Sequence, residues 1–187
     1  MITAQFITTD YIYKYTIIEA NVDADMVNKF IWKAQYQNIQ EILGTNLYNK
    51  LVADCPNFTG QYQTLMNSYV QPVLAEWTVY HMMPFINFRL TNKAVSVKSS
   101  DNSQPSTVED IKWLLSQVRN NAEFLSEQMK DYIKNNISLF PEFYQRVNPF
   151  DMSPNKTNYF SGIATKGRLV RAPIPPLNNI DPNDFCC

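Results

Sequence analysis

Residues 106–136 decide the fold, and they read STVEDIKWLLSQVRNNAEFLSEQMKDYIKNN. Ser106 and Glu109 stand at the spacing of a helix capping box. Apolar or small side chains then recur at alternating steps of three and four residues: Val108, Ile111, Leu115, Val118, Ala122, Leu125, Met129 and Tyr132. This heptad pattern predicts one helix, roughly 45 Å long, whose seam packs on another helix.

Only the segment 61–90 is long enough to pair with that helix. It carries an apolar stripe at helical spacing, formed by Tyr62, Leu65, Met66, Tyr69, Val73, Trp77, Tyr80 and Phe88. Pro72 and Pro84 each remove one intrahelical hydrogen bond, which predicts either kinks or a chain of shorter helices. The connection 91–105 permits an antiparallel pair, and the heptad period favours a left-handed crossing near +20°.

A second helical unit is predicted closer to the N-terminus. Asp23 is a good N-cap for a helix whose apolar stripe is Met26, Val27, Phe30, Ile31, Ala34, Ile39, Ile42 and Leu43. Gly44 ends this helix in the way that a glycine at the C′ position does. Thr45 then caps a short helix that ends near Ala53.

The remaining segments are predicted to be arms and a loop. Residues 1–22 indicate an N-terminal arm with one helical turn at residues 10–15, capped by Thr9 or Asp10. Residues 91–105 indicate a polar loop or the tip of a short β-hairpin. Residues 149–187 hold six of the eleven prolines, which indicates an extended C-terminal arm. The prediction is an all-α bundle of about four helices at 23–148, with extended N- and C-terminal arms.

Composition excludes several classes of protein. The 187 residues carry a net charge of −1, whereas a general nucleic-acid binder needs a strong basic excess. Four glycines are too few for a glycine-rich nucleotide loop. Residues 1–6 lack the charged and apolar regions of a signal peptide, and no apolar run reaches the length of a membrane span. We therefore expect a protein made in the cytoplasm, without a membrane partner.

The sequence offers little catalytic chemistry. His81 is the only histidine and stands in an apolar helical stretch, so a core or interface position is the favoured interpretation. Cys55, Cys186 and Cys187 form neither a disulfide framework nor a metal-ligand spacing. Paired carboxylates lie at predicted helix starts, where they offset the helix dipole. Residues 181–184 lack the spacing and the glycine of a calcium loop. We predict no enzyme activity, no cofactor and no metal site.

The predicted partner-binding residues lie on the arms and on the loop. The C-terminal arm cannot bury enough surface to fold alone but is too apolar for a plain linker, which favours docking on a partner or on its own core. The candidates are Phe6, Tyr11 and Tyr15 in the N-terminal arm, Val95, Val97 and Lys98 in the loop, and Tyr159, Phe160, Lys166, Arg168 and Arg171 in the C-terminal arm.

Two stretches carry a resemblance to a known family. Residues 30–51 read FIWKAQYQNIQEILGTNLYNKL, a helix–Gly–helix unit, and residues 69–77 read YVQPVLAEW. With the long helix that follows a polar loop, they resemble the head–tail connector proteins of tailed bacteriophages, most closely the ring or adaptor proteins of crAss-like and related Bacteroidetes phages. The resemblance covers about residues 7–145 and leaves the proline-rich tail unmatched.

The resemblance implies a structural virion protein, an α-helical adaptor in the neck that forms a ring, commonly twelve-fold, between the portal protein and the next tail component. DNA would pass through the lumen without specific binding. The alternative is a small cytosolic nucleic-acid-binding or regulatory module that places Lys166, Arg168 and Arg171 on phosphate. A steep salt dependence of affinity would favour that alternative.

Overall fold

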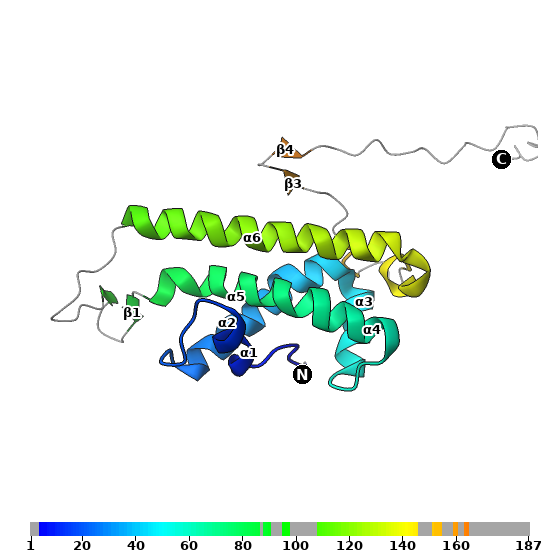
Figure 1. Cartoon of the computed structure of the whole chain (residues 1–187), viewed down its shortest axis with the longest axis horizontal. Helices are drawn as coiled ribbons and strands as arrows, with labels where there is room; N and C mark the ends of the chain where they lie inside the picture. The colour runs from blue at the N-terminus through cyan, green and yellow to red at the C-terminus, as the bar shows by residue number, and fades with distance from the viewer. Residues whose placement is uncertain are drawn as a thin grey trace, which may run out of the picture. The chain divides into compact units, whose positions relative to one another are not determined.

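The structure, a computed structural model, describes residues 4–86, 88–90, 95–97, 108–145, 151–154, 159–160 and 163–164. The chain divides into two compact units, Met1–Lys156 and Thr157–Cys187. Within the first unit the described residues form a bundle of helices (Figure 1). The predicted all-α class is therefore confirmed, and the strands that occur are two or three residues long.

The helical elements are α1 (Thr9–Tyr15), α2 (Ala24–Ala34), the π turn η1 (Gln35–Ile39), α3 (Gln40–Asp54), α4 (Gly60–Leu65), the π turn η2 (Met66–Val70), α5 (Gln71–Ile86), α6 (Val108–Asn135) and the 3₁₀ turns η3 (Ile137–Leu139) and η4 (Pro141–Phe143). The strands are β1 (Phe88–Leu90) and β2 (Val95–Val97) in the first unit, and β3 (Tyr159–Phe160) and β4 (Ile163–Ala164) in the second. Each pair is antiparallel.

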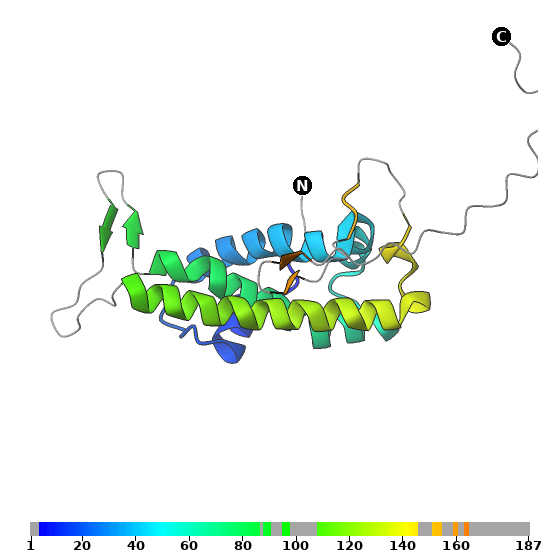
Figure 2. The same ribbon diagram turned by 90° about the horizontal axis from the view of Figure 1, so that it is seen from above.

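The 28-residue helix α6 runs antiparallel to α5 and lies beside it in both views (Figures 1 and 2). Near one end the rings of Tyr69 and Tyr132 stack with their centroids 4.2 Å apart. Further along, Trp77 Nε1 donates a hydrogen bond to Ser126 Oγ at 3.0 Å. The predicted antiparallel pair is confirmed. Three seam residues of α6 are buried, namely Val118, Ala122 and Met129.

Helix α5 is the centre of the bundle, because it packs against α6 on one side and α2 on the other (Figure 1). A helix covered on several sides needs apolar residues around most of its circumference. The buried residues of α5 accordingly exceed a single stripe, and they are Val73, Leu74, Ala75, Thr78, Val79, Met82 and Met83.

Pro72 and Pro84 have different effects on this helical region. The helical run continues from α4 through η2 into α5, so the alternative of separate shorter helices is wrong. The wide turn η2 stands just before Pro72, and Gln71 N–H donates to the Met66 carbonyl. A π turn of this kind is a recognised irregularity of helices. Pro84 lies inside α5, and the helix ends soon after it at Ile86.

The predicted continuation of this helix to Leu90 is wrong. Residues 88–90 form β1 instead, with Phe88 opposite Val97 and Leu90 opposite Val95. Pro84 removes a hydrogen bond from the last turns of the helix, which favours an early end. The hairpin alternative for the loop is thereby confirmed for the residues that the structure describes there.

The start and stop signals near the N-terminus are mostly confirmed. Asp23 accepts a hydrogen bond from the Asp25 backbone N–H at 3.0 Å. Gly44 interrupts α3 with φ 74° and ψ 160°. The cap of α1 differs from the prediction, because it is Thr8, whose Oγ1 accepts from Tyr11 N–H at 3.3 Å. Ser106 of the predicted capping box lies outside the described residues.

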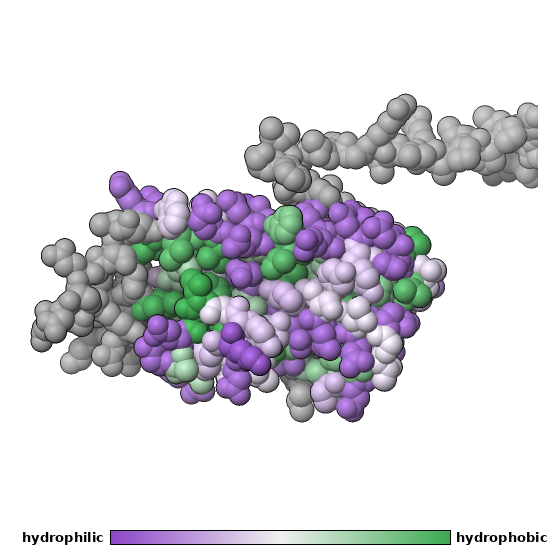
Figure 3. All heavy atoms as spheres, in the orientation of Figure 1, coloured by the Kyte–Doolittle hydropathy of each residue, from purple (hydrophilic) through white to green (hydrophobic). Residues whose placement is uncertain are grey.

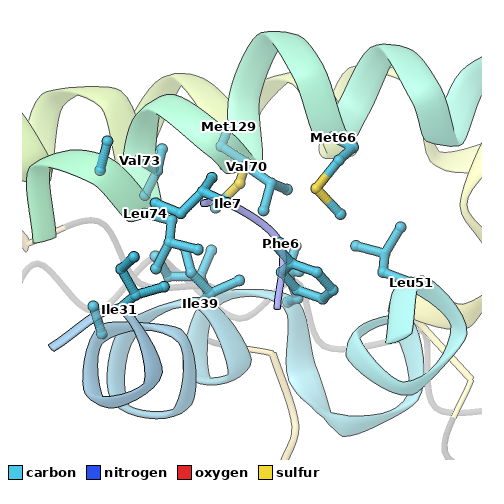
Figure 4. Close-up of a cluster of buried hydrophobic side chains, with 14 of the residues drawn as sticks. Phe6, Ile7, Ile31, Ile39, Leu51, Met66, Val70, Val73, Leu74 and Met129 are labelled. Atoms are coloured by element: carbon cyan, nitrogen blue, oxygen red, sulfur yellow. The ribbon is translucent and has the colours of Figure 1, made fainter. Parts of the chain in front are cut away.

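The N-terminal stretch is part of the core. Phe6 and Ile7 are each 3% exposed, and Ile12 and Ile18 are also buried. Figure 4 shows Phe6 and Ile7 among side chains that come from α2, η1, α3, η2 and α5. The predicted arm is therefore corrected for the described residues 4–22. The free energy gained by burying four large apolar side chains exceeds the conformational entropy that the segment loses when it becomes ordered.

A buried glutamine fastens this stretch to the bundle. Gln35 is fully buried in η1, and its Nε2 donates to the Ala4 carbonyl at 2.8 Å and to Tyr48 OH at 3.0 Å. Its Oε1 accepts from the Phe6 backbone N–H at 3.0 Å. Gln71 Nε2 adds a bond to the Phe6 carbonyl at 3.1 Å. The side chains of Gln35 and Gln71 thus give the extended backbone the partners that buried polar groups require.

The Gln35 side chain is predicted to be essential for the N-terminal stretch. Replacement Q35A leaves the buried Phe6 N–H without its acceptor, which costs about 1–3 kcal/mol of the free energy of unfolding. Urea denaturation followed by circular dichroism measures the loss. The matched control is Q37A, because Gln37 is exposed in the same turn. Equal stability of the two variants would contradict this role.

Candidate docking surfaces

The helix–Gly–helix unit is the place where residues 151–154 lie on the bundle. The left-handed backbone of Gly44 brings the chain close to Pro154. A Cβ atom at Gly44 would stand 2.7 Å from Pro154 Cδ and 2.8 Å from Pro154 N, which is closer than real side chains approach. Glycine is thus required here both for its φ and for the space above it.

The two residues after Gly44 hold the neighbouring segments by hydrogen bonds. Thr45 N–H donates to the Met152 carbonyl at 3.0 Å, and Met152 N–H donates to Thr45 Oγ1 at 3.1 Å. Asn46 Nδ2 donates to the carbonyls of Glu142 at 3.3 Å and Gln145 at 3.1 Å. The unit therefore recognises backbone of segments about a hundred residues away, and this recognition requires few particular side chains in the docked segment.

A small cavity remains between these parts. Its volume is about 80 Å³, and its lining comes from Leu43, Gly44 and Asn46 and from residues 142–145 and 151–154. Small-molecule sites usually measure several hundred Å³. The cavity is thus large enough for a few water molecules and too small for a typical cofactor.

A polar cluster fixes the chain that follows α6. Tyr62 OH donates to Glu142, with 2.9 Å to Oε2 and 3.0 Å to Oε1. Lys50 Nζ lies 5.5 Å from the centre of the Tyr62 ring and 3.0 Å from Asp54 Oδ1. Burial, and then the hydrogen bond and the charge of Glu142, raise the pKa of Tyr62 to about 12. The cluster therefore holds the phenol in its protonated form.

The predicted docking residues of the N-terminal stretch have different surroundings. Phe6 belongs to the core, where its ring meets Tyr48 edge-on with centroids 5.5 Å apart, so its assignment to a partner interface is corrected. Tyr11 is half-buried, and its ring lies 4.6 Å from that of Tyr15. Tyr15 is 59% exposed, with Lys14 Nζ 5.1 Å from its ring centre. Of the three residues predicted in this stretch, Tyr11 and Tyr15 therefore lie together at the surface.

For the other predicted docking residues, the structure describes either the backbone alone or nothing. Val95 and Val97 lie in β2, opposite Leu90 and Phe88. Tyr159 and Phe160 form β3 and pair with Ala164 and Ile163. The four basic candidates, Lys98, Lys166, Arg168 and Arg171, lie outside the described residues.

Exposed apolar side chains on the helices were not among the predicted docking residues. Trp113 is 66% and Phe124 is 62% exposed on α6, and Phe85 near the end of α5 is 38% exposed. Figure 3 shows a mostly hydrophilic face with hydrophobic residues gathered over the end of α5 and the start of α6. The helical period could have indicated that Trp113 and Phe124 are exposed, because both positions lie opposite the heptad seam.

The candidate catalytic side chains have separate surroundings. His81 Nε2 lies 2.8 Å from Asn38 Oδ1, and burial, followed by the charge of Lys33, lowers the pKa of His81. Cys55 Sγ lies 3.8 Å from the Gln5 carbonyl, and burial raises the pKa of its thiol. Among the described residues no group of three or more His, Cys, Asp or Glu side chains could hold a metal ion. None of the described helices combines the length and apolar character that a membrane crossing requires.

A model of the family DUF6712, described as a family of unknown function, matches residues 39–148, and the chain belongs to this family. The matched part runs from the end of η1 through η4, so it includes Gly44 and the Tyr62–Glu142 cluster. Comparison with curated proteins and with solved structures finds no match.

The close approach at Gly44 predicts a specific loss in the variant G44A. The backbone of Gly44, with φ 74° and ψ 160°, is in a region that residues with a Cβ rarely adopt, at a cost of about 1–3 kcal/mol, and the collision with Pro154 adds about 1–3 kcal/mol. The matched control is G60A, because Gly60 also has a positive φ of 57° but has no atom within 4 Å of the Cβ that alanine would add. Urea denaturation and hydrogen exchange of the Thr45 amide measure the effect. Equal losses in both variants would show that residues 151–154 do not rest on Gly44.

The Tyr62–Glu142 contact predicts a pH dependence at high pH. Because the pKa of Tyr62 rises from 10.0 to about 12 in the folded protein, the contact stabilises fully below pH 10. That stabilisation disappears as the pH rises through about 12. We expect the free energy of unfolding of Y62F to fall less steeply between these two values than that of the unmodified chain. The exposed control Y144F should follow the unmodified chain, and a Y62F curve parallel to it would refute the contact's role.

Proposed function

We propose that this chain is a structural adaptor of a phage head–tail connector, which forms a ring between the portal protein and the next tail component around the DNA channel. The observation that carries the proposal is the helix–Gly–helix unit. The residues with the strongest resemblance to connector proteins, 30–51, contain the Gly44–Asn46 docking site for an extended segment of the chain. In this role the protein performs no catalysis.

A docking site that binds backbone suits an assembly of identical copies. Heterologous contacts between such copies close into a ring when the rotation permits. Extended segments that become ordered only against a neighbour limit assembly to the correct template, because the ordering entropy is recovered only there. The proposed partners are further copies of the chain, the portal protein and the next tail or ring protein, while DNA passes the lumen without specific binding. The proposed location is the neck of the virion.

The test is cross-linking mass spectrometry on purified particles from an infection that produces this chain. We expect cross-links from the chain to itself and to portal or tail subunits. If the chain is absent from the particles and found free in infected cells, the proposal is overturned. A steep salt dependence of nucleic-acid affinity would then favour the regulatory alternative.

Variants of the chain test the docking site and the absence of catalysis in the same particles. We expect G44A to enter particles less efficiently than G60A, because only the former disturbs the docking site. The variants H81A and C55A test for a catalytic role, and incorporation and infectivity should remain unchanged in both. A loss of infectivity in particles of normal composition would contradict a purely structural role.

A further inference from the structure

A shallow groove lies where the C-terminal half of α6 meets η2. Its volume is about 390 Å³, which is within the range usual for binding sites. The rings of Tyr69 and Tyr132 stack with their centroids 4.2 Å apart, and both side chains are partly exposed. The full lining is Tyr69, Gln128, Asp131, Tyr132, Asn135 and Asn136. The groove thus combines a pair of aromatic rings with polar side chains.

Two of the polar side chains are exposed amides with a definite spacing. Gln128 and Asn135 are seven residues apart on α6, which is about 10 Å along the helix axis. Among the described residues neither side chain makes a hydrogen bond to the protein. Each amide NH₂ group can donate two hydrogen bonds. The groove therefore offers donors to two acceptors about 10 Å apart.

A polyproline II segment has acceptors at this spacing. The conformation repeats every three residues with a rise of about 3.1 Å per residue, so equivalent carbonyls stand about 9 Å apart. These carbonyls have no partners within the segment. Proline-rich segments of this kind bind in grooves lined by aromatic rings. The stacked tyrosines and the two amides therefore have the chemistry that recognises polyproline II.

The chain contains a segment of this type. Residues 171–176 read RAPIPP and lie outside the described residues. Their composition predicts polyproline II. Pro173 and Pro176 are three residues apart, so in that conformation they would share one edge of the segment. One edge could thus pack on the tyrosine rings while carbonyls meet the amides.

Charge also matches this segment to the groove. Asp131 is the charged residue of the lining, and it is exposed. Its Oδ1 lies 3.8 Å from Lys134 Nζ, which is longer than a hydrogen bond, so the carboxylate can still accept from an arginine. Arg171 stands two residues before the first proline of the segment, and no acidic residue occurs between Met152 and Asp181.

The groove lies close to the point where the chain after α6 is anchored. Pro154 rests on Gly44, and Asn46 donates a hydrogen bond to the Glu142 carbonyl. The 3₁₀ turns η3 and η4 shorten the stretch between Glu142 and Asn136, which lines the groove. These steps put the groove within roughly 35 Å of Pro154.

The segment can reach this groove within one copy of the chain. From Pro154 to Pro173 the chain can span about 50 Å, even with residues 159–164 folded back as β3 and β4. A tether that is long enough gives the attached segment a high effective concentration at the groove. In dilute solution the segment of another copy has no such advantage. Reach therefore favours the segment of the same copy as the occupant.

We propose that the groove binds residues 171–176 of the same copy in the polyproline II conformation. The prolines pack on the stacked tyrosines, and backbone carbonyls accept hydrogen bonds from Gln128 and Asn135. Arg171 pairs with Asp131. This inference goes beyond the proposed function and does not rest on it, because it concerns a single copy of the chain.

Nuclear magnetic resonance of the full chain tests the contact. The natural chain is compared with the variant P173A/P175A/P176A, whose polyproline II preference is weaker. We expect the side-chain amide resonances of Gln128 and Asn135 to shift between the two proteins. The control is Gln117, an exposed amide on the same helix about 16 Å from Gln128, whose resonances should not move. No shift at the two groove amides, or an equal shift at Gln117, would overturn the proposal.

A peptide added to that variant tests the groove itself. The peptide RAPIPPLN has the sequence of residues 171–178. We expect it to return the resonances of Gln128 and Asn135 toward their positions in the natural chain. The peptide's dissociation constant, followed on the backbone resonances of α6, should rise about tenfold in Q128A/N135A, as for the loss of two hydrogen bonds. The control Q117A should leave it unchanged, and circular dichroism checks that all variants keep their helices. Equal dissociation constants in Q128A/N135A and Q117A would contradict the assignment of the groove.

Mixing experiments identify the copy that supplies the segment. The isotope-labelled variant P173A/P175A/P176A is mixed with an equal amount of the unlabelled natural chain. We expect no return of the groove resonances, because the segment of each natural chain occupies its own groove. A return would show exchange between copies and overturn the same-copy assignment. None of these outcomes decides whether the chain is present in particles, so the proposed function is tested separately.

Discussion

The packing of α5 against its neighbours is the constraint on which the rest of this structure depends. Apolar residues occupy several sides of α5, so one partner helix cannot cover it. Helix α6 covers one side and α2 another, and the N-terminal residues Phe6 and Ile7 fill space beside η2. The length of α6 follows from this arrangement, because it must run beside the whole of α5 and η2 to bury Tyr132 against Tyr69.

Two extended segments complete this core by the same chemistry. At one place Gln35 binds the backbone of Ala4 and Phe6, and at the other Thr45 and Asn46 bind the backbone of residues 142–152. Both anchors stand at interruptions of a helix, the π turn η1 and the break at Gly44. Such interruptions leave helical backbone or side chains available to an added segment, which a regular helix does not.

These features bear on the adaptor role proposed above. The described part of the chain offers hydrogen-bonding anchors for extended segments and exposed aromatic side chains on a long helix, whereas His81 and Cys55 contact different polar groups. The anchors already hold segments of this chain, so the exposed face of α6 is a described surface that is left for a partner in the proposed adaptor role.

The sequence by itself determined the elements whose signals are local. The heptad of α6, the cap at Asp23 and the break at Gly44 each depend on residues within one or two helical turns. Only the tertiary structure decided that Phe6 is core, that residues 88–90 leave the helix, and that Pro154 lies above Gly44. Trp113 and Phe124 belong to this second group, although the helical period placed them opposite the seam. The reason is physical: burial and backbone hydrogen bonds between distant segments depend on which surfaces meet, and a pattern along the chain records only which surfaces are apolar.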